Sequence, residues 1–485
     1  MLSKKFSNYL VKNVKNTLNA YTNKKFNSKL KIFNKNVKRG IINKSYKHGL
    51  KTLKKLNKKL YKSNKKSNKR KINISKTRPK IPIIGGLNLE DLMHICPDSG
   101  ECIALGNQKD ALINFFGGFT NFENVEYPIV RIGVASQNGT VYKLKYTIND
   151  YSSYALLKCP QSKKSDNLVY EYEVGLFINK QCRRFSCFLE TYGLYFFKDI
   201  EAYSTLFSYP NTKLETLLEQ QHSIDYKKAC DESNLAAILI EHVGNSITLN
   251  TLYENNKTND DFINYDLPQI LFQVYFTLAQ LAREKSFTHY DLHHSNVLVY
   301  ILPENKYVNF KYTSDIHPNV SFQSRYIAKI IDYGKCYYKD DNSNSLITFE
   351  KICEEPSCEP DCGMKYGFIH LNETKRDETH DGSTVSIYFN RSSDLKLLYL
   401  FRNVISIQKL GTLFYHPSRP ISNFDQYKKW SKILDTNNFI DTVVDAAIAL
   451  VHYINNINRE IPIEKCIGIL QIDNINPLIY TSLIL

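Results

Sequence analysis

Central to this sequence is His289-Tyr290-Asp291-Leu292-His293-His294-Ser295-Asn296-Val297-Leu298-Val299, a polar loop that runs into a short apolar strand. Asp291 and Asn296 lie five residues apart. A carboxylate can orient a hydroxyl group and accept its proton, and an amide oxygen is a ligand that suits Mg²⁺. A short loop anchored by the strand after it would hold both groups in one place.

A second motif follows downstream, Ile330-Ile331-Asp332-Tyr333-Gly334, in which an apolar strand ends in Asp-Tyr-Gly. The carboxylate of Asp332 is an oxygen ligand of the kind that Mg²⁺ prefers. The order of the two motifs and the apolar strand beside each indicate one composite site.

The two motifs resemble the catalytic loop and the Asp-Phe-Gly metal site of the protein-kinase-like family. The resemblance covers roughly residues 128–410. His293 is similar to the histidine of haspin-type and aminoglycoside-phosphotransferase-like kinases, where the commonest Ser/Thr kinases have lysine. Together with the Lys- and Asn-rich composition, the motifs resemble putative serine/threonine kinases of large DNA viruses. The resemblance implies an α+β fold with two lobes.

The resemblance also implies a nucleotide site in the first lobe. Strands are predicted at residues 129–133, 140–146 and 153–158, and the turn between the first two stands where the family has its glycine-rich loop. Only Gly139 and Val141 match that loop, with Ser136 at its middle glycine, so an ordinary hairpin turn is the alternative. Lys158 ends an Ala-Leu-Leu-Lys strand and would pair the α- and β-phosphates of ATP.

The helix predicted at residues 167–181 should supply the glutamate that holds Lys158. We choose Glu171, because Gly175 one turn later leaves room for the helix to approach the sheet, and Glu173 is the rival. Residues 235–243 form an apolar strand that leads into the hinge, where Glu241 to Val243 would offer backbone hydrogen bonds to adenine.

The second lobe should contain a long core helix, Leu267 to Lys285, ahead of the catalytic loop. Residues 302–324 are predicted to be a polar and aromatic insertion. Asp394 is a natural helix N-cap and also falls where the family has an aspartate that braces the catalytic loop. We expect residues 414–485 to alternate helical stretches, such as 439–457, with loops.

Three cysteines, Cys353, Cys358 and Cys362, lie in the stretch after Asp332 that lacks the usual Ala-Pro-Glu. With His370 they could form a zinc knuckle, and reduced thiols are the alternative.

The charge is unevenly divided along the chain. The net charge of +16 hides a tail, residues 1–80, with 27 Lys and Arg and no acidic residue. The remaining residues hold 37 basic and 48 acidic side chains, a net charge of −11. The tail is interpreted as a nucleic-acid-binding arm or nuclear address, or as a solvated disordered or partly helical extension. The predicted domains are residues 1–80 (extension), 81–127 (small helical cap), 128–243 (first lobe) and 244–485 (second lobe).

The chain shows no membrane span and no apolar leader near its start, and its 11 cysteines follow no disulfide framework. We therefore expect an intracellular protein that is not secreted, and the resemblance to kinases of large DNA viruses implies host cytoplasm or virion.

The resemblance implies ATP- and Mg-dependent phosphoryl transfer to protein Ser/Thr hydroxyls. Asp291 would orient the acceptor, Asn296 and Asp332 would hold magnesium, and His289 would brace the loop. Tyr290 replaces the arginine that many kinases place before this aspartate, so activity should not need activating phosphorylation. A small-molecule kinase of the aminoglycoside or choline type and an inactive pseudokinase acting as a virion or scaffold protein remain open.

Overall fold

The chain divides into two units, residues 1–85 and 86–485, and every residue that the structure describes belongs to the second. The computed structural model describes residues 104–136, 139–160, 168–221, 224, 235–315, 319–340, 344–345, 348, 389, 393–401, 404, 413–414, 439–440, 442–457, 459, 461–473 and 476–482. The predicted basic extension, the first part of the cap, and Cys353, Cys358 and Cys362 lie outside these residues.

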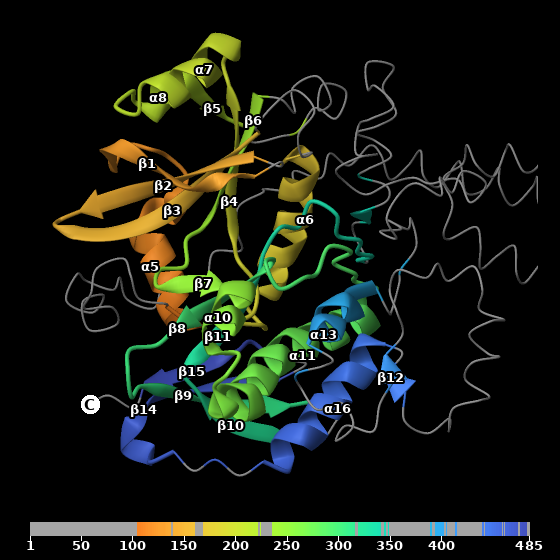
Figure 1. The fold of residues 1–485 in the computed structure, drawn as a ribbon. Coiled ribbons are helices and arrows are strands. Elements are labelled where there is room, and N and C mark those ends of the chain that lie inside the picture. Colours follow the sequence, from red (N-terminus) through yellow and green to blue (C-terminus); the bar gives the residue numbers. More distant parts are fainter. Residues whose placement is uncertain are drawn as a thin grey trace, which may run out of the picture. The chain divides into compact units, whose positions relative to one another are not determined.

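The fold is α+β, as the sequence predicts, and its largest sheet has six strands in the order β1-β2-β3-β6-β4-β5 (Figure 1). All neighbouring pairs in it are antiparallel. Its strands are β1 (Val125–Ser136), β2 (Gly139–Ile148), β3 (Tyr151–Cys159), β4 (Thr191–Phe197), β5 (Leu218–Gln220) and β6 (Ala236–Glu241).

The sequence of strand β6 is apolar almost throughout because hydrophobic residues cover both faces of the strand. Ala236 and Ile238 belong to one hydrophobic cluster and Ala237 and Leu239 to another, on opposite faces of the sheet. Because side chains alternate along a strand, a strand covered on both faces needs an unbroken apolar run. The predicted strand at 235–243 is therefore a central one.

One face of the sheet is covered by aromatic side chains that precede it in the chain. Helix α5 (Asn107–Phe115) and the 3-10 turn η1 (Gly117–Phe119) pack there, with Phe116 and Phe119 against Tyr146. The described part of the predicted cap thus contains an α-helix at residues 107–115 and a 3-10 turn at residues 117–119. Strand β1 begins at Val125 rather than at residue 129 as predicted, because Val125 and Glu126 already pair with β2.

The core of the second lobe is α11 (Leu267–Lys285), with the bounds that the sequence predicts. It is buried from Leu267 to Ala282, and α16 (Val443–Asn455) packs along it (Figure 1). The remaining helices and turns are α6 (Leu168–Gln181), α7 (Ile200–Ser208), α8 (Leu214–Leu217), α10 (Leu249–Asn256), the π-helix η3 (Phe262–Asp266), η4 (Ser393–Leu395), α13 (Lys396–Leu400) and η6 (Ile463–Lys465).

The prediction of helices and loops for residues 414–485 is wrong in its last part. The structure has β14 (Cys466–Asp473) and β15 (Ile479–Ser482) there. The predicted insertion supplies their partners, because β9 (Tyr307–Thr313) and β10 (Val320–Ser324) complete a sheet in the order β10-β9-β14-β15. Strand β14 runs parallel to β9, more than a hundred residues earlier, so only the tertiary structure pairs them.

Two smaller sheets complete the described fold. One has the order β11-β8-β7, and the other pairs two short strands in parallel. Their strands are β7 (Ser246–Thr248), β8 (Val297–Ile301), β11 (Tyr326–Ile330), β12 (Leu413–Phe414) and β13 (Phe439–Ile440). The motifs follow this arrangement: Asn296 precedes β8 and Asp332 follows β11. Among the described residues, no helix is long and apolar enough to cross a membrane.

Candidate functional site

Lys158 lies near the end of β3, on the face of the sheet opposite the cap. Its neighbours Leu157 and Cys159 are fully buried in the cluster under α5, so alternation along the strand turns Lys158 the other way. Val141 on β2 is its direct partner across the strands. The sheet therefore sets Val141 beside Lys158.

The ammonium group of Lys158 is held by Glu171 of α6. Lys158 Nζ donates to Glu171 Oε2 at 2.7 Å, and both side chains are largely buried. Helix α6 comes this close because Gly175 faces β4, where an added Cβ would lie 2.2 Å from Thr191 Oγ1. The structure thus places Glu171, the residue chosen from the sequence, against Lys158.

Asp332 approaches the same ammonium group from the other lobe, with its Oδ1 3.2 Å from Lys158 Nζ. Burial alone would raise the pKa of Asp332, but the charge and hydrogen bond of Lys158 outweigh it and hold that pKa below its ordinary value. Asp332 is therefore ionised at neutral pH and its side chain is 24% exposed. It has a positive φ of 68°, a conformation uncommon for residues other than glycine.

Asp394 holds the backbone of the catalytic-loop motif through hydrogen bonds to its carboxylate. The backbone amides of His289 and Tyr290 donate to Asp394 Oδ2 and Oδ1 at 2.7 and 3.0 Å. Burial raises the pKa of Asp394, although these two amides favour its charged form. The predicted N-cap role is wrong: Asp394 lies inside the 3-10 turn η4, and both carboxylate oxygens accept bonds from the loop.

His289 is fully buried and links the loop to the second motif. Its Nε2 lies 3.0 Å from the Ile331 carbonyl, and its Nδ1 lies 3.3 Å from the Asp291 amide. A carbonyl can only accept and an amide can only donate, so this geometry assigns the neutral tautomer with hydrogen on Nε2. The ring thus holds the backbone on either side of the site.

Asn296 is oriented by the loop itself. Its Nδ2 donates to the Asp291 carbonyl at 2.9 Å, so Oδ1 is the side-chain atom suited to a metal. The Ile331 amide donates to the Asn296 carbonyl at 3.0 Å and ties the two motifs together. An amide oxygen with one carboxylate fits Mg²⁺, which usually completes its shell with water and phosphate oxygens.

Tyr333 stands where the Asp-Phe-Gly motif has phenylalanine, and its hydroxyl group makes two hydrogen bonds to the backbone. The Leu189 amide donates to Tyr333 Oη at 2.9 Å, and this oxygen donates to the Ile330 carbonyl at 2.8 Å. The buried phenol therefore fixes the Asp-Tyr-Gly segment against the strand before it. Neither bond is open to phenylalanine.

The two hinge residues predicted to bind adenine, Glu241 and Val243, differ in which of their backbone groups already make hydrogen bonds within the protein. The Glu241 amide donates to the Glu190 carbonyl at 2.8 Å, so it is not available to adenine. The Val243 carbonyl accepts from Ser246 Oγ at 2.7 Å. Adenine recognition by the backbone of Val243 stays a prediction.

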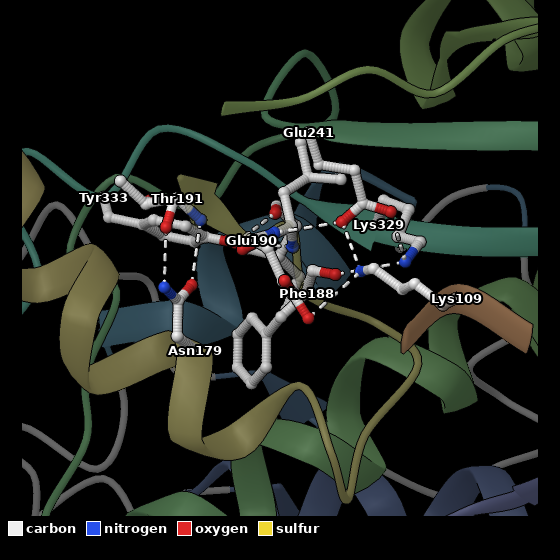
Figure 2. A network of polar contacts seen from close by, with 10 residues as sticks. Lys109, Asn179, Phe188, Glu190, Thr191, Glu241, Lys329 and Tyr333 are labelled. Atoms are coloured by element: carbon white, nitrogen blue, oxygen red, sulfur yellow. Dashed lines mark hydrogen bonds and ion pairs between the residues drawn. The ribbon is translucent and has the colours of Figure 1, made fainter. Parts of the chain in front are cut away.

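The side chain of Glu241 belongs to a buried polar network that the sequence did not reveal (Figure 2). Glu241 Oε2 accepts from Lys109 Nζ of α5 at 2.5 Å and from the Glu190 amide at 3.0 Å, and Oε1 lies 3.7 Å from Lys329 Nζ. Lys329 also donates to the Phe188 carbonyl at 3.1 Å. The network joins the cap, β6 and β11 through residues far apart in sequence.

A cavity of about 30 Å³ adjoins this network, between α5 and the hinge. Such a volume has room for about two water molecules, so this cavity is not a nucleotide pocket.

Close packing of two strands explains why residue 139 is glycine, even without a role in phosphate binding. A Cβ at this residue would lie 2.6 Å from the Cys159 carbonyl oxygen, because β2 approaches β3 closely there. Residues 137–138, at the tip of the predicted glycine-rich loop, lie outside the described part of the chain. Phosphate binding by Gly139 therefore stays a prediction.

Lys335 is the site residue that sequence reasoning missed. It follows Asp332-Tyr333-Gly334 directly, and its Nζ donates to Asp291 Oδ2 at 2.9 Å. A lysine immediately after the metal motif is the one signal that could have indicated it. The structure thus brings Lys158, Asp332, Asn296, Asp291 and Lys335 to one region between the two lobes.

No known protein family matches the chain by sequence, and no curated protein matches it. Among solved structures, a crystal structure described as a kinase domain is similar, with a TM-score of 0.26 and 14% identity. The match covers 45% of this chain and 54% of that chain. A likeness this low carries no argument about activity, and the function is therefore inferred from the geometry of the site.

Proposed function

We propose that the chain is an ATP- and Mg-dependent phosphotransferase of protein-kinase-like fold, acting on Ser/Thr hydroxyls of proteins. The observation that carries the proposal is the convergence on Lys158, where Glu171 and Asp332 approach one ammonium group from two lobes at 2.7 and 3.2 Å. A lysine held in this way can position the phosphates of ATP.

Each residue then has one task. Lys158 binds the α- and β-phosphates, and Asp291 orients the acceptor hydroxyl. The acceptor oxygen attacks the γ-phosphorus, the bond to the β–γ bridging oxygen breaks, and ADP leaves with that electron pair. The hydroxyl proton passes to the Asp291 carboxylate.

Magnesium would be held by Asn296 Oδ1 and the Asp332 carboxylate, and when bound it would neutralise charge on the phosphates. Among the described residues, no group of three or more His, Cys, Asp or Glu side chains could hold a metal ion. A magnesium ion held by two protein oxygens would take its remaining ligands from water and substrate phosphates.

The test is nucleotide binding and turnover with and without magnesium. Binding of ATP should tighten with Mg²⁺, and Asp332→Ala should abolish turnover while the protein stays folded. Asp315→Ala is a matched control, because Asp315 is an exposed aspartate paired with Arg283 away from the motifs. Equal ATP binding in chelator, together with normal turnover by Asp332→Ala, would contradict the metal assignment.

The choice of protein Ser/Thr acceptors is supported by the resemblance of the motifs, by the long basic tail and by the extended stretch of sequence after Asp332. A panel of proteins and small alcohols as phosphate acceptors separates it from a small-molecule kinase. The pseudokinase alternative is opposed by the intact contacts of Lys158 with Glu171 and Asp332. Absence of any turnover with bound Mg-ATP would favour it.

Residues 1–80 are proposed to bind nucleic acid, supported by 27 Lys and Arg without an acidic residue. Binding should weaken steeply as salt rises, because counterion release scales with the number of phosphates neutralised. A chain beginning near Lys80 should lose this binding and keep its nucleotide chemistry. The resemblance to kinases of large DNA viruses supports action in host cytoplasm or virion.

A further inference from the structure

Lys335 faces the two carboxylates of the proposed site. Its Nζ donates to Asp291 Oδ2 at 2.9 Å, and its charge also acts on Asp332. The Lys335 side chain is 28% exposed and that of Asp291 19%, so solvent reaches the pair. An incoming phosphate group can therefore reach the same ammonium hydrogens.

The ion pair is not needed to hold its two segments together. Thr288 and Tyr337 exchange backbone hydrogen bonds of 2.9 and 2.8 Å, which fasten the segment after Asp332 to the start of the catalytic loop. Cys336, next to Lys335, is buried, and its carbonyl accepts from Tyr170 Oη at 2.6 Å. A partly exposed ion pair adds little to such a scaffold. The scaffold instead fixes where the lysine stands.

Two side chains near Asp291, those of Lys158 and His293, do not supply this charge. Lys158 already contacts Glu171 and Asp332. His293, two residues after Asp291, accepts the Ser295 amide at Nδ1, and burial lowers the pKa of its ring, so it is neutral at pH 7. A neutral imidazole cannot offset the charge of a phosphoryl group.

We propose that Lys335 is the cation that binds the transferred γ-phosphoryl group beside Asp291, an inference that rests on the proposed function. On nucleotide binding its ammonium group donates hydrogen bonds to γ-phosphoryl oxygens and keeps its proton throughout. Asp291 is then released to take the acceptor hydroxyl. Preorganised charge aimed at the reacting group lowers the barrier to transfer.

The test compares a nucleotide that carries a γ-phosphate with one that lacks it. In Lys335→Met, calorimetry should show binding of the Mg-bound β,γ-imido analogue of ATP weakened about ten-fold or more, and Mg-ADP binding unchanged. Turnover should fall on the order of 10²–10³-fold. Lys335→Arg should restore part of the affinity for the β,γ-imido analogue and part of the turnover.

Lys285→Met is the matched control, because Lys285 donates to Asp340 at 2.6 Å and is 23% exposed, yet stands apart from the motifs. It should leave both nucleotide affinities unchanged. If Lys335→Met weakens the binding of both nucleotides equally, or weakens neither, the proposed role of Lys335 is wrong and the proposed function still stands. A native protein that binds neither nucleotide overturns the proposed function and this role with it.

Discussion

Two lysine–glutamate pairs in this molecule have nearly the same geometry and different surroundings. Lys158 and Glu171 are 2.7 Å apart, and Lys109 and Glu241 are 2.5 Å apart. Both lysine side chains are 12% exposed, and the glutamates are 5% and 8% exposed. Distance and burial alone therefore do not distinguish the pair in the candidate site from the pair behind the hinge.

The third partner distinguishes them. Lys158 is shared with Asp332, a partly exposed carboxylate from the other lobe, so this pair adjoins the candidate site. Glu241 is instead shared by Lys109, Lys329 and the Glu190 amide, and all of these groups are largely buried (Figure 2). An ion pair that ends in a partly exposed carboxylate can act on a ligand, whereas a closed network serves to hold elements together.

The largest expected effect is on stability, from the closed network. Glu241→Gln removes the carboxylate that Lys109 and Lys329 share, leaves Lys109 only the more distant Glu190 at 3.8 Å, and should lower the free energy of unfolding by about 3–5 kcal/mol. Urea denaturation measures it. Glu171→Gln should lower the free energy of unfolding clearly less, because Lys158 still has its ion pair with Asp332. Equal losses would mean that the third partner does not separate the two pairs.

The next effect is on turnover, from the other pair. Lys158→Met should lower kcat on the order of 10²–10³-fold, because a preorganised positive charge on the phosphates is lost. Its melting temperature should also fall, because Glu171 and Asp332 lose their shared cation, so turnover is measured at a temperature where the variant is folded. In Lys109→Met the folded protein should keep its turnover. A comparable loss of kcat in Lys109→Met would show that the hinge network takes part in catalysis.

A smaller effect is expected in acid. Burial raises the pKa of Glu241, but Lys109 and Lys329 outweigh it, so its folded-state pKa lies below the ordinary 4.5. Such a group stabilises the fold above pH 4.5 and loses that contribution as pH falls through its lowered pKa. The stability gap between the native protein and Glu241→Gln should therefore shrink below about pH 4.5. A gap constant from pH 7 to pH 3 would contradict this.

The smallest effect is expected for an exposed pair. Lys145 Nζ lies 2.8 Å from Glu126, with side chains 40% and 46% exposed. Because solvent screens such a pair, Glu126→Gln should change the free energy of unfolding by at most about 1 kcal/mol. A loss as large as that of Glu241→Gln would show that burial is not what separates these pairs.

Local patterns in the sequence were enough for the elements that carry the motifs. Apolar runs and helical periodicity predicted β6 and the bounds of α11, and Gly175 indicated which glutamate faces Lys158. These features depend on residues near one another in the chain, where alternation and turn spacing act directly.

The tertiary structure alone decided the contacts between distant segments. It paired β14 with β9 and set Lys335 against Asp291. It also assembled the network around Glu241 from α5, β6 and β11. A single charged residue looks the same in sequence whether solvent or a distant carboxylate faces it, so only the packing of the chain fixes its partner.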